Sequence, residues 1–114
     1  MTDKILALST AANVEEARRI ARGLVDAGLA ACVNVVPGIT SVYRWKGNVE
    51  ESAEVLLIIK TRQDLSAAVS AGLRELHSYE LPEFITLPLT GGLPQYLQWI
   101  EDETRVPGQG PDSL

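Results

Sequence analysis

The sequence predicts an α+β domain of the ferredoxin-like, split β-α-β type. Short apolar runs that are typical of strands alternate with amphipathic helical patterns, and their order is β-α-β-β-α-β followed by a C-terminal helix. The length of 114 residues suits a single domain. We expect residues 1–106 to form this domain, and residues 107–114, which are rich in Pro and Gly, to form a flexible C-terminal tail.

The first two elements are predicted to be a buried strand and an amphipathic helix. Lys4–Ser9 is short and apolar, as in strands that are covered on both faces. Asn13 is expected to cap the helix that follows, because Glu16 stands three residues later and apolar residues then recur at helical spacing as far as Val25. Gly28 is expected to end this helix.

A long hairpin is predicted in the middle of the chain. Ala31–Lys46 has an extended pattern with an irregularity at Pro37-Gly38, and Gly47-Asn48 suits a two-residue turn because both residues tolerate positive φ. The return strand ends in Val55–Ile59, an apolar run typical of a central strand. Both strands are expected to exceed ten residues, against a usual length of about five or six. The overhang is therefore expected to pair with another chain, the alternative being a hairpin that bends over its own sheet.

The second half of the chain completes the pattern. Asp64 is expected to cap a second helix, which ends near Leu76 and has a glycine in its interior, Gly72, that suggests close packing. Phe84–Leu89 is expected to be an edge strand, because it contains a proline that has no N–H to donate. A short helix is predicted around residues 96–100.

Composition excludes several classes of function. The chain has 10 Lys and Arg against 15 Asp and Glu, and a net charge of -5 argues against a general nucleic-acid binder. We also expect no membrane partner, since no apolar run reaches the length of a span and the first residues lack the layout of a signal peptide. A single cysteine, Cys32, fits the cytoplasm. No catalytic motif of the common hydrolase, metalloprotease or phosphate-loop types is present, so we expect no enzyme.

Several long motifs resemble the CutA divalent-cation tolerance proteins. They are Ala31–Gly47 (ACVNVVPGITSVYRWKG), Glu54–Thr61 (EVLLIIKT), His77–Glu83 (HSYELPE) and Tyr96–Ile100 (YLQWI), and they occur in the order found in that family. The resemblance implies a homotrimer similar to the PII signalling proteins, with long hairpins that reach across neighbouring subunits. It also implies a role in the tolerance of copper and other divalent metals, without a settled enzymatic activity.

His77 and Cys32 are the candidate metal ligands. His77 matches a histidine in the family's metal-binding loop, and imidazole suits copper and zinc; alternatively, it caps the C-terminus of the second helix. Cys32 matches the family's cysteine and as a thiolate would bind a soft metal, although a lone cysteine in an apolar strand is more often a small buried hydrophobe. Some relatives have another His and another Cys where this chain has Leu76 and Ser9. We therefore expect weak binding of Cu²⁺, ahead of Zn²⁺, with no metal required for folding.

A pocket between subunits is the other candidate site. Its predicted residues are Tyr43, Trp45, Lys60, Tyr79 and Glu80. Lys60 and Glu80 are expected to form a partly buried charge pair, and with aromatic walls the pocket would hold a small anionic ligand. The alternative is that these residues only pack an interface. Glu50, Glu51 and Glu54, which follow the predicted turn, are expected to form a solvated face.

Three functions follow from these observations. The first is a trimeric metal-tolerance protein that binds divalent cations weakly through His77 and carboxylates between subunits. The second is a PII-like regulatory trimer that binds a small molecule between subunits and signals to a partner. The third is a non-enzymatic scaffold without a ligand. The fold alone does not choose among them, because the ferredoxin-like architecture hosts many unrelated functions.

Overall fold

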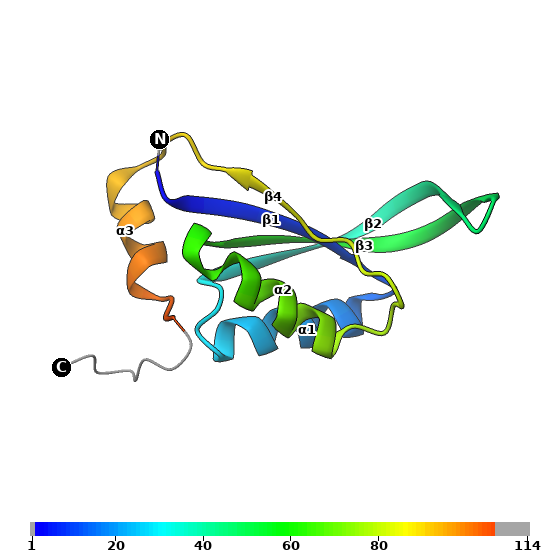
Figure 1. Ribbon diagram of the computed structural model, residues 1–114, viewed down its shortest axis with the longest axis horizontal. Coiled ribbons are helices and arrows are strands. Elements are labelled where there is room, and N and C mark those ends of the chain that lie inside the picture. The colour runs from blue at the N-terminus through cyan, green and yellow to red at the C-terminus, as the bar shows by residue number, and fades with distance from the viewer. Residues whose placement is uncertain (1, 107–114) are drawn as a thin grey trace.

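The computed structural model describes residues 2–106, which form three α-helices and four strands (Figure 1). Their order is β1 (Lys4–Ala11), α1 (Val14–Asp26), β2 (Cys32–Trp45), β3 (Asn48–Arg62), α2 (Ser66–Leu76), β4 (Ile85–Pro88) and α3 (Pro94–Asp102). The predicted β-α-β-β-α-β order with a final helix is therefore confirmed. The predicted tail, residues 107–114, lies outside the described residues. Within residues 2–106 no helix is long and apolar enough to span a membrane.

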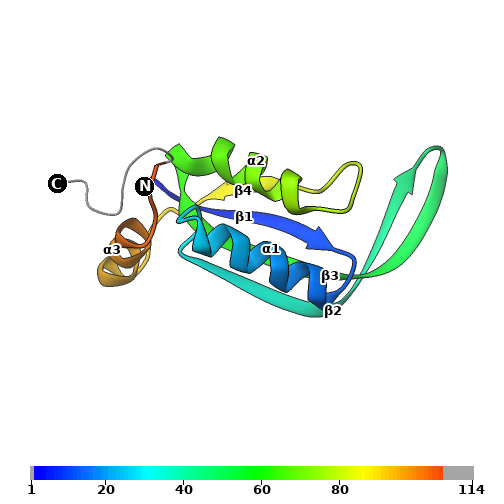
Figure 2. The same ribbon diagram turned by 90° about the horizontal axis from the view of Figure 1, so that it is seen from below.

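The four strands form one antiparallel sheet in the order β2-β3-β1-β4. Helices α1 and α2 lie side by side on one face of this sheet, as Figure 2 shows from below. Helix α3 packs at the end where β1 begins and contacts β3. Helices α1 and α2 leave the opposite face of the sheet uncovered, and we call it the open face. Among residues 2–106 the only helix that contacts its side chains is α3, at the end where β1 begins.

The core lies between the sheet and the pair α1 and α2. Its fully buried side chains come from both layers: Ala7, Ile20, Leu24, Leu57, Ile59, Leu65, Val69 and Leu73. Helices α1 and α2 approach each other closely. A Cβ added at Gly72 of α2 would lie 3.5 Å from Leu24 Cδ2 of α1, and one added at Gly23 of α1 would lie 2.7 Å from Leu76 Cδ1 of α2. The close packing predicted at Gly72 is thus observed.

The predicted ends of α1 are also observed. The side chain of Asn13 accepts a hydrogen bond of 2.8 Å from the amide of Glu16, and Glu16 Oε1 accepts one of 3.3 Å from the amide of Ala12, so that both side chains satisfy free amides at the helix start. At the other end, Gly28 follows the C-cap residue Ala27 and has a φ of +73°, a left-handed conformation that favours glycine.

Two local predictions were wrong. The hairpin turn consists of Lys46 and Gly47, with φ values of 51° and 85°, whereas Asn48 already pairs with Trp45 as the first residue of β3. Asp64 does not cap α2, because its carboxylate binds the guanidinium of Arg62 at 2.6 and 3.0 Å. A 3₁₀ turn at Gln63–Leu65 leads into α2 instead.

The hairpin is as long as the sequence predicts. Strands β2 and β3 have 14 and 15 residues, and β1 pairs with only the second half of β3, Val55–Arg62. The first half of β3 and its partner in β2 extend past the body, which makes the molecule 52 Å long against 27 and 22 Å in the other directions (Figure 1). A β-bulge between Val36 and Ile39 separates the two halves of the hairpin.

The open face is mostly apolar. Leu6, Leu8, Leu56 and Ile58 lie half-buried on it, and the edge strand β4 adds Ile85 and Leu87, which are 53% and 44% exposed. The register aligns Leu6 with Leu87, and Leu8 with Ile85, so these side chains share one surface. An apolar surface of this kind on a single chain is typical of an interaction site.

Candidate functional site

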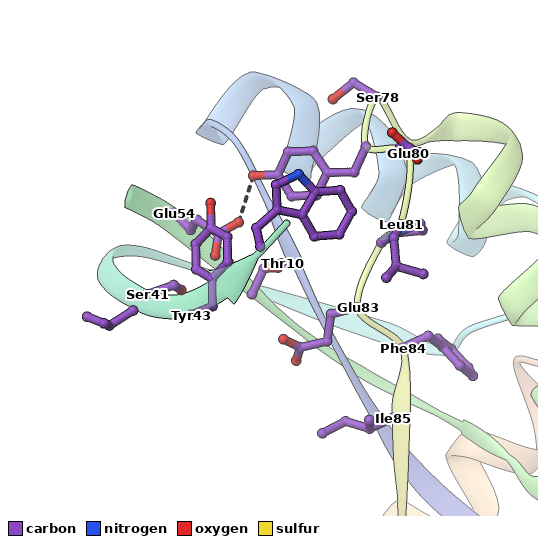
Figure 3. A pocket seen from close by; sticks show the side chains of 14 residues that line it. Thr10, Ser41, Tyr43, Glu54, Ser78, Glu80, Leu81, Glu83, Phe84 and Ile85 are labelled. Atoms are coloured by element: carbon purple, nitrogen blue, oxygen red, sulfur yellow. Dashed lines mark hydrogen bonds between the residues drawn. The ribbon is translucent and has the colours of Figure 1, made fainter. Parts of the chain in front are cut away.

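A cavity of about 920 Å³ lies between the projecting half of the hairpin and the loop that joins α2 to β4 (Figure 3). We call it the hairpin pocket. Its walls are Thr10 of β1, Ser41, Val42, Tyr43, Trp45 and Glu54 of the hairpin, and residues 78–85 of the loop and β4. Of the five residues predicted to share a pocket, the structure brings together Tyr43, Trp45, Tyr79 and Glu80 and leaves out Lys60.

The hairpin and the loop meet at Glu54 and Tyr79. The hydroxyl of Tyr79 donates a 2.6 Å hydrogen bond to Glu54 Oε2, beside the ring of Tyr43 (Figure 3). Burial raises the pKa of Tyr79, and the Glu54 carboxylate raises it further, so the phenol stays protonated. Glu54 is only 9% exposed, so its predicted place on a solvated face was wrong, whereas Glu50 and Glu51 are exposed.

Glu54 was missed as a site residue although a signal existed. It has the same parity in β3 as Leu56 and Ile58, which alternation places on the open face. A run of three acidic residues after a turn suggested solvent instead. Its burial depends on the loop that folds over it, and that loop begins 23 residues later at His77, beyond the reach of a local pattern.

The hairpin pocket is acidic. Glu54, Glu80 and Glu83 line it, and none of its lining residues is Lys or Arg. Aromatic walls with several carboxylates suit a cationic group rather than an anion. Within one chain, the anionic ligand predicted for this pocket would therefore lack a positive partner.

Lys60 lies elsewhere, on the open face. It stands between Leu6 of β1 and Cys32 of β2 in the sheet, and its ammonium lies 5.9 Å from the centroid of the Tyr96 ring. Among residues 2–106 it forms no ion pair with Glu80. The predicted Lys60–Glu80 pair is therefore absent from the described part of a single chain, because Lys60 lies six residues along β3 from Glu54 and the pocket, or about 20 Å at the usual rise of a strand.

His77 is fully buried at the C-cap of α2 and uses both ring nitrogens. Nδ1 accepts a 3.1 Å hydrogen bond from the amide of Tyr79, and Nε2 lies 2.7 Å from the carbonyl oxygen of Thr10. Since Nδ1 acts as an acceptor, we assign the proton to Nε2, which donates to Thr10. His77 stands at the C-cap of α2, but its ring bonds Thr10 of β1 and the amide of Tyr79 rather than a carbonyl of α2, and in this arrangement neither nitrogen has a free lone pair for a metal.

Glu16 and Ser9 anchor the same loop. Glu16 Oε2 accepts a 2.8 Å hydrogen bond from the amide of Ser78, and the Ser9 hydroxyl donates one of 2.7 Å to the carbonyl of Glu83. Burial would raise the pKa of Glu16, but hydrogen bonds from Ser78 and Ala12 outweigh it and hold the pKa below its ordinary value. Both ends of the pocket loop are thus fixed to the core by polar contacts.

The two candidate metal ligands are not brought together. Cys32 is a half-buried free thiol on β2, and its neighbour across the sheet, Lys60, pairs in turn with Leu6 of β1. His77 contacts a different residue of β1, Thr10. Leu6 and Thr10 are four residues apart on β1, or about 13 Å at the usual rise of a strand. In the part of the chain that the structure describes, no three His, Cys, Asp or Glu side chains are placed to hold a metal ion. A complete metal site within one chain does not fit these residues.

The fold and the site define a class of protein. It is a small α+β protein with a four-stranded antiparallel sheet, one apolar open face and a pocket between a projecting hairpin and a loop. Residues 5–103 match the model of the CutA1 divalent ion tolerance protein family, and the chain belongs to this family.

Individual relatives agree with this assignment. The chain is 44% identical over 97 residues to the divalent-cation tolerance protein CutA of Thermus thermophilus, covering 85% of this chain and 94% of that protein. It is 46% identical over 101 residues to a chloroplastic CutA protein of Arabidopsis thaliana, covering 89% of this chain but only 56% of the plant protein. The chain thus spans little more than half the length of some of its curated relatives.

Solved structures show the same fold. The crystal structure of CutA from Xylella fastidiosa superposes with a TM-score of 0.89 at 42% identity, covering 91% of this chain and all of that one. CutA1 from Oryza sativa gives a TM-score of 0.87 at 46% identity, with 90% and 94% covered. A structure from Archaeoglobus fulgidus is described as a periplasmic divalent cation tolerance protein, with a TM-score of 0.85, 38% identity, and 88% and 97% covered.

Proposed function

We propose that the chain works as a homotrimeric, ferredoxin-like protein of divalent-cation tolerance, without enzymatic activity. The trimer is proposed from the apolar open face, on which Ile85 and Leu87 are exposed beside Leu6 and Leu8, and the role in divalent-cation tolerance is proposed from membership of the CutA1 family. A PII-like arrangement, in which the open faces of three sheets meet, would remove this surface from water. The projecting hairpin supports it, because its unpaired edges can pair with a neighbour.

Light scattering on the purified protein tests the assembly. The expected mass is three times the 12.3 kDa of one chain. Ile58→Lys places a charge in the middle of the open face and should reduce the mass to that of a monomer. The matched control is Val25→Lys, at an exposed valine of α1 on the opposite layer, which should remain a trimer. A monomeric mass for the unmodified protein would contradict the proposal.

Metal binding is proposed to be weak and to be a property of the trimer. Cu²⁺ at His77 would displace the amide of Tyr79 or the carbonyl of Thr10 from a ring nitrogen, and carboxylates of a second subunit would have to complete the site. Zn²⁺ is expected to bind more weakly still. No metal is proposed as a requirement for folding, since the core between the helices and the sheet is formed by apolar side chains.

Calorimetric titration of the trimer with Cu²⁺ tests this site. His77→Gln should lower the affinity, because an amide is a poorer copper ligand than imidazole. Cys32→Ala, titrated in parallel, tests the thiol as a second ligand. An unchanged isotherm for His77→Gln would show that His77 is not a copper ligand. An unchanged isotherm for Cys32→Ala would show that the thiol only packs on the open face.

The hairpin pocket favours a second candidate function, that of a PII-like regulator that binds a small molecule. Its volume of about 920 Å³ lies in the range of ligand sites, and aromatic side chains form much of its wall. Native mass spectrometry of the trimer, purified without denaturant, should then show an added mass that Trp45→Ala removes. A trimer without added mass, whose Cu²⁺ titration is also flat, would favour the third candidate, the scaffold.

The absence of catalysis and the compartment are parts of the proposal. His77 is the only histidine, and with both nitrogens bonded it is not available as a general base for Thr10, Ser41 or Ser78 in the pocket. The cytoplasm is proposed because a lone cysteine suits a reducing environment. Cell fractionation tests it directly, since relatives are described as chloroplastic and periplasmic.

A further inference from the structure

Lys60 carries a charge without a carboxylate partner in the described chain. Three cations lie near the end of the sheet where β1 begins, and two are paired. Lys4 contacts Asp3 and lies 2.9 Å from Glu101, and Arg62 binds Asp64 and Glu101. Lys60, two residues before Arg62 on the same face of β3, lies 5.9 Å from the centroid of the Tyr96 ring and forms no ion pair among residues 2–106.

The hairpin pocket has the opposite imbalance. Glu54, Glu80 and Glu83 line it without a basic side chain, and Glu54 is nearly buried. One oxygen of Glu54 is bound by the hydroxyl of Tyr79, which is a neutral donor and leaves the negative charge in place. Figure 3 shows this carboxylate on the hairpin side of the pocket, with Leu81, Glu83 and Phe84 on the side of the loop.

We propose that in the assembled protein the ammonium group of Lys60 from a second copy enters the hairpin pocket and pairs with its carboxylates. This inference rests on the proposed trimer, because covering the open face takes Lys60 out of water. An unpaired ammonium costs several kcal/mol when it is desolvated, and a carboxylate already held in an aromatic cavity offsets that cost. The apolar stem of Lys60 suits the aromatic walls.

The site is incomplete without the second copy. One subunit supplies Tyr43, Trp45, Tyr79 and Glu80, and the partner subunit supplies the cation. The five residues that the sequence groups in one pocket then meet across a subunit boundary. The same pairing gives the interface a specific register. In any other alignment of two apolar faces the charge of Lys60 would be desolvated without a partner, which is unfavourable.

Zero-length cross-linking with a carbodiimide tests this contact. The reagent joins a lysine amine and a carboxylate by an amide bond only when the two groups touch. The trimer should give covalently linked subunits on a denaturing gel, and mass spectrometry of the digest should identify Lys60 joined to Glu54, Glu80 or Glu83. The matched control is Lys60→Arg, which keeps the positive charge but has no amine to join. It should remain a trimer and lose this peptide.

Isotope mixing shows which copies are joined. Trimers reassembled from ¹⁵N-labelled and unlabelled chains should contain the linked peptide with one labelled and one unlabelled half. Lys60→Met should lower the thermal midpoint of the trimer more than Lys60→Arg does. A trimer that yields no link from Lys60 to these three glutamates, or yields it only with both halves alike in label, would overturn the inference and leave the trimer standing. A monomer in light scattering would overturn both.

Discussion

The Tyr79 hydroxyl and the Glu54 carboxylate, 25 residues apart in the chain, form the 2.6 Å hydrogen bond that closes the hairpin pocket on one side. The loop that carries Tyr79 is attached to the core through its backbone, because Glu16 and His77 accept hydrogen bonds from the amides of Ser78 and Tyr79. The pocket therefore has its shape from a few polar contacts rather than from apolar packing alone, and each of these contacts can be removed separately.

Removal of the Tyr79 hydroxyl should loosen the loop. Tyr79→Phe leaves the nearly buried Glu54 carboxylate without its donor, and we expect a loss of about 1.5–3 kcal/mol in the free energy of unfolding. Urea denaturation at constant protein concentration measures it. Tyr43→Phe is the matched control, since the Tyr43 hydroxyl bonds to Ser52 on the exposed hairpin and should be worth less. Equal losses in both variants would contradict the special role of the Glu54 contact.

Glu16 should make the stability depend on acid. Its pKa is below the ordinary value of 4.5 in the folded chain, so the carboxylate stabilises the fold above that pH and the contribution is lost as the pH falls through the lower value. Glu16→Gln should reduce the thermal midpoint at pH 7 and flatten the acid limb, so that the curves of the two proteins converge at low pH. Glu15→Gln, at the exposed neighbour, should follow the unmodified protein throughout. Parallel curves for Glu16→Gln would contradict the assignment.

Glu101 should hold α3 on the sheet. Its carboxylate lies 2.9 Å from Lys4 and 3.2 Å from Arg62. Among residues 2–106, no other residue of α3 forms an ion pair with these two cations. Glu101→Gln should accelerate hydrogen exchange in residues 94–102, with a global loss below about 1 kcal/mol because the carboxylate is partly exposed. Glu103→Gln, at an exposed residue without an ion pair among residues 2–106, is the control. Unchanged exchange in α3 would show that its apolar contacts suffice.

Gly28 should resist substitution. Its φ of +73° is a left-handed conformation, so Gly28→Ala should lower the free energy of unfolding by about 1 kcal/mol. The cost comes from the backbone and not from a clash, because the atom nearest to an added Cβ is Arg105 Cγ at 3.6 Å. Gly91→Ala is the control, since a Cβ there has no neighbour within 4 Å and its φ is not positive. Chemical denaturation compares the two. A neutral Gly28→Ala would show that the turn after α1 relaxes.

The parts of the fold that could be predicted are those that depend on residues close together in the sequence. The cap at Asn13, the glycine after α1 and the irregularity of the hairpin at Pro37-Gly38 each depend on residues close in the chain, and all are observed. The errors at Asp64 and at the turn have the same origin. The Asp64 carboxylate binds Arg62 instead of capping α2, and the turn lies one residue earlier than predicted because Trp45 pairs with Asn48.

The candidate site was harder to predict, because the hydrogen bonds that hold its loop in place involve backbone atoms of Thr10, Ser78 and Tyr79. His77 contacts a carbonyl and an amide, and a sequence carries no residue type that marks such partners. Four of the five predicted pocket residues do meet, but Lys60 lies six residues from Glu54 along β3, and Glu54 is buried by a loop distant in the chain. Burial that depends on distant segments does not show in a local pattern.

The β-bulge between Val36 and Ile39 constrains how this hairpin can change in length. Opposite the single residue Val55, β2 has the two residues Pro37 and Gly38, so the parity of β2 reverses there relative to β3. This reversal puts Tyr43 and Trp45 on the same face as Glu54. Deleting one residue would rotate both rings to the far side of the strand. An insertion or deletion of one residue in this stretch would therefore empty the wall of the pocket, whereas a substitution that keeps the residue count leaves the faces of both strands unchanged.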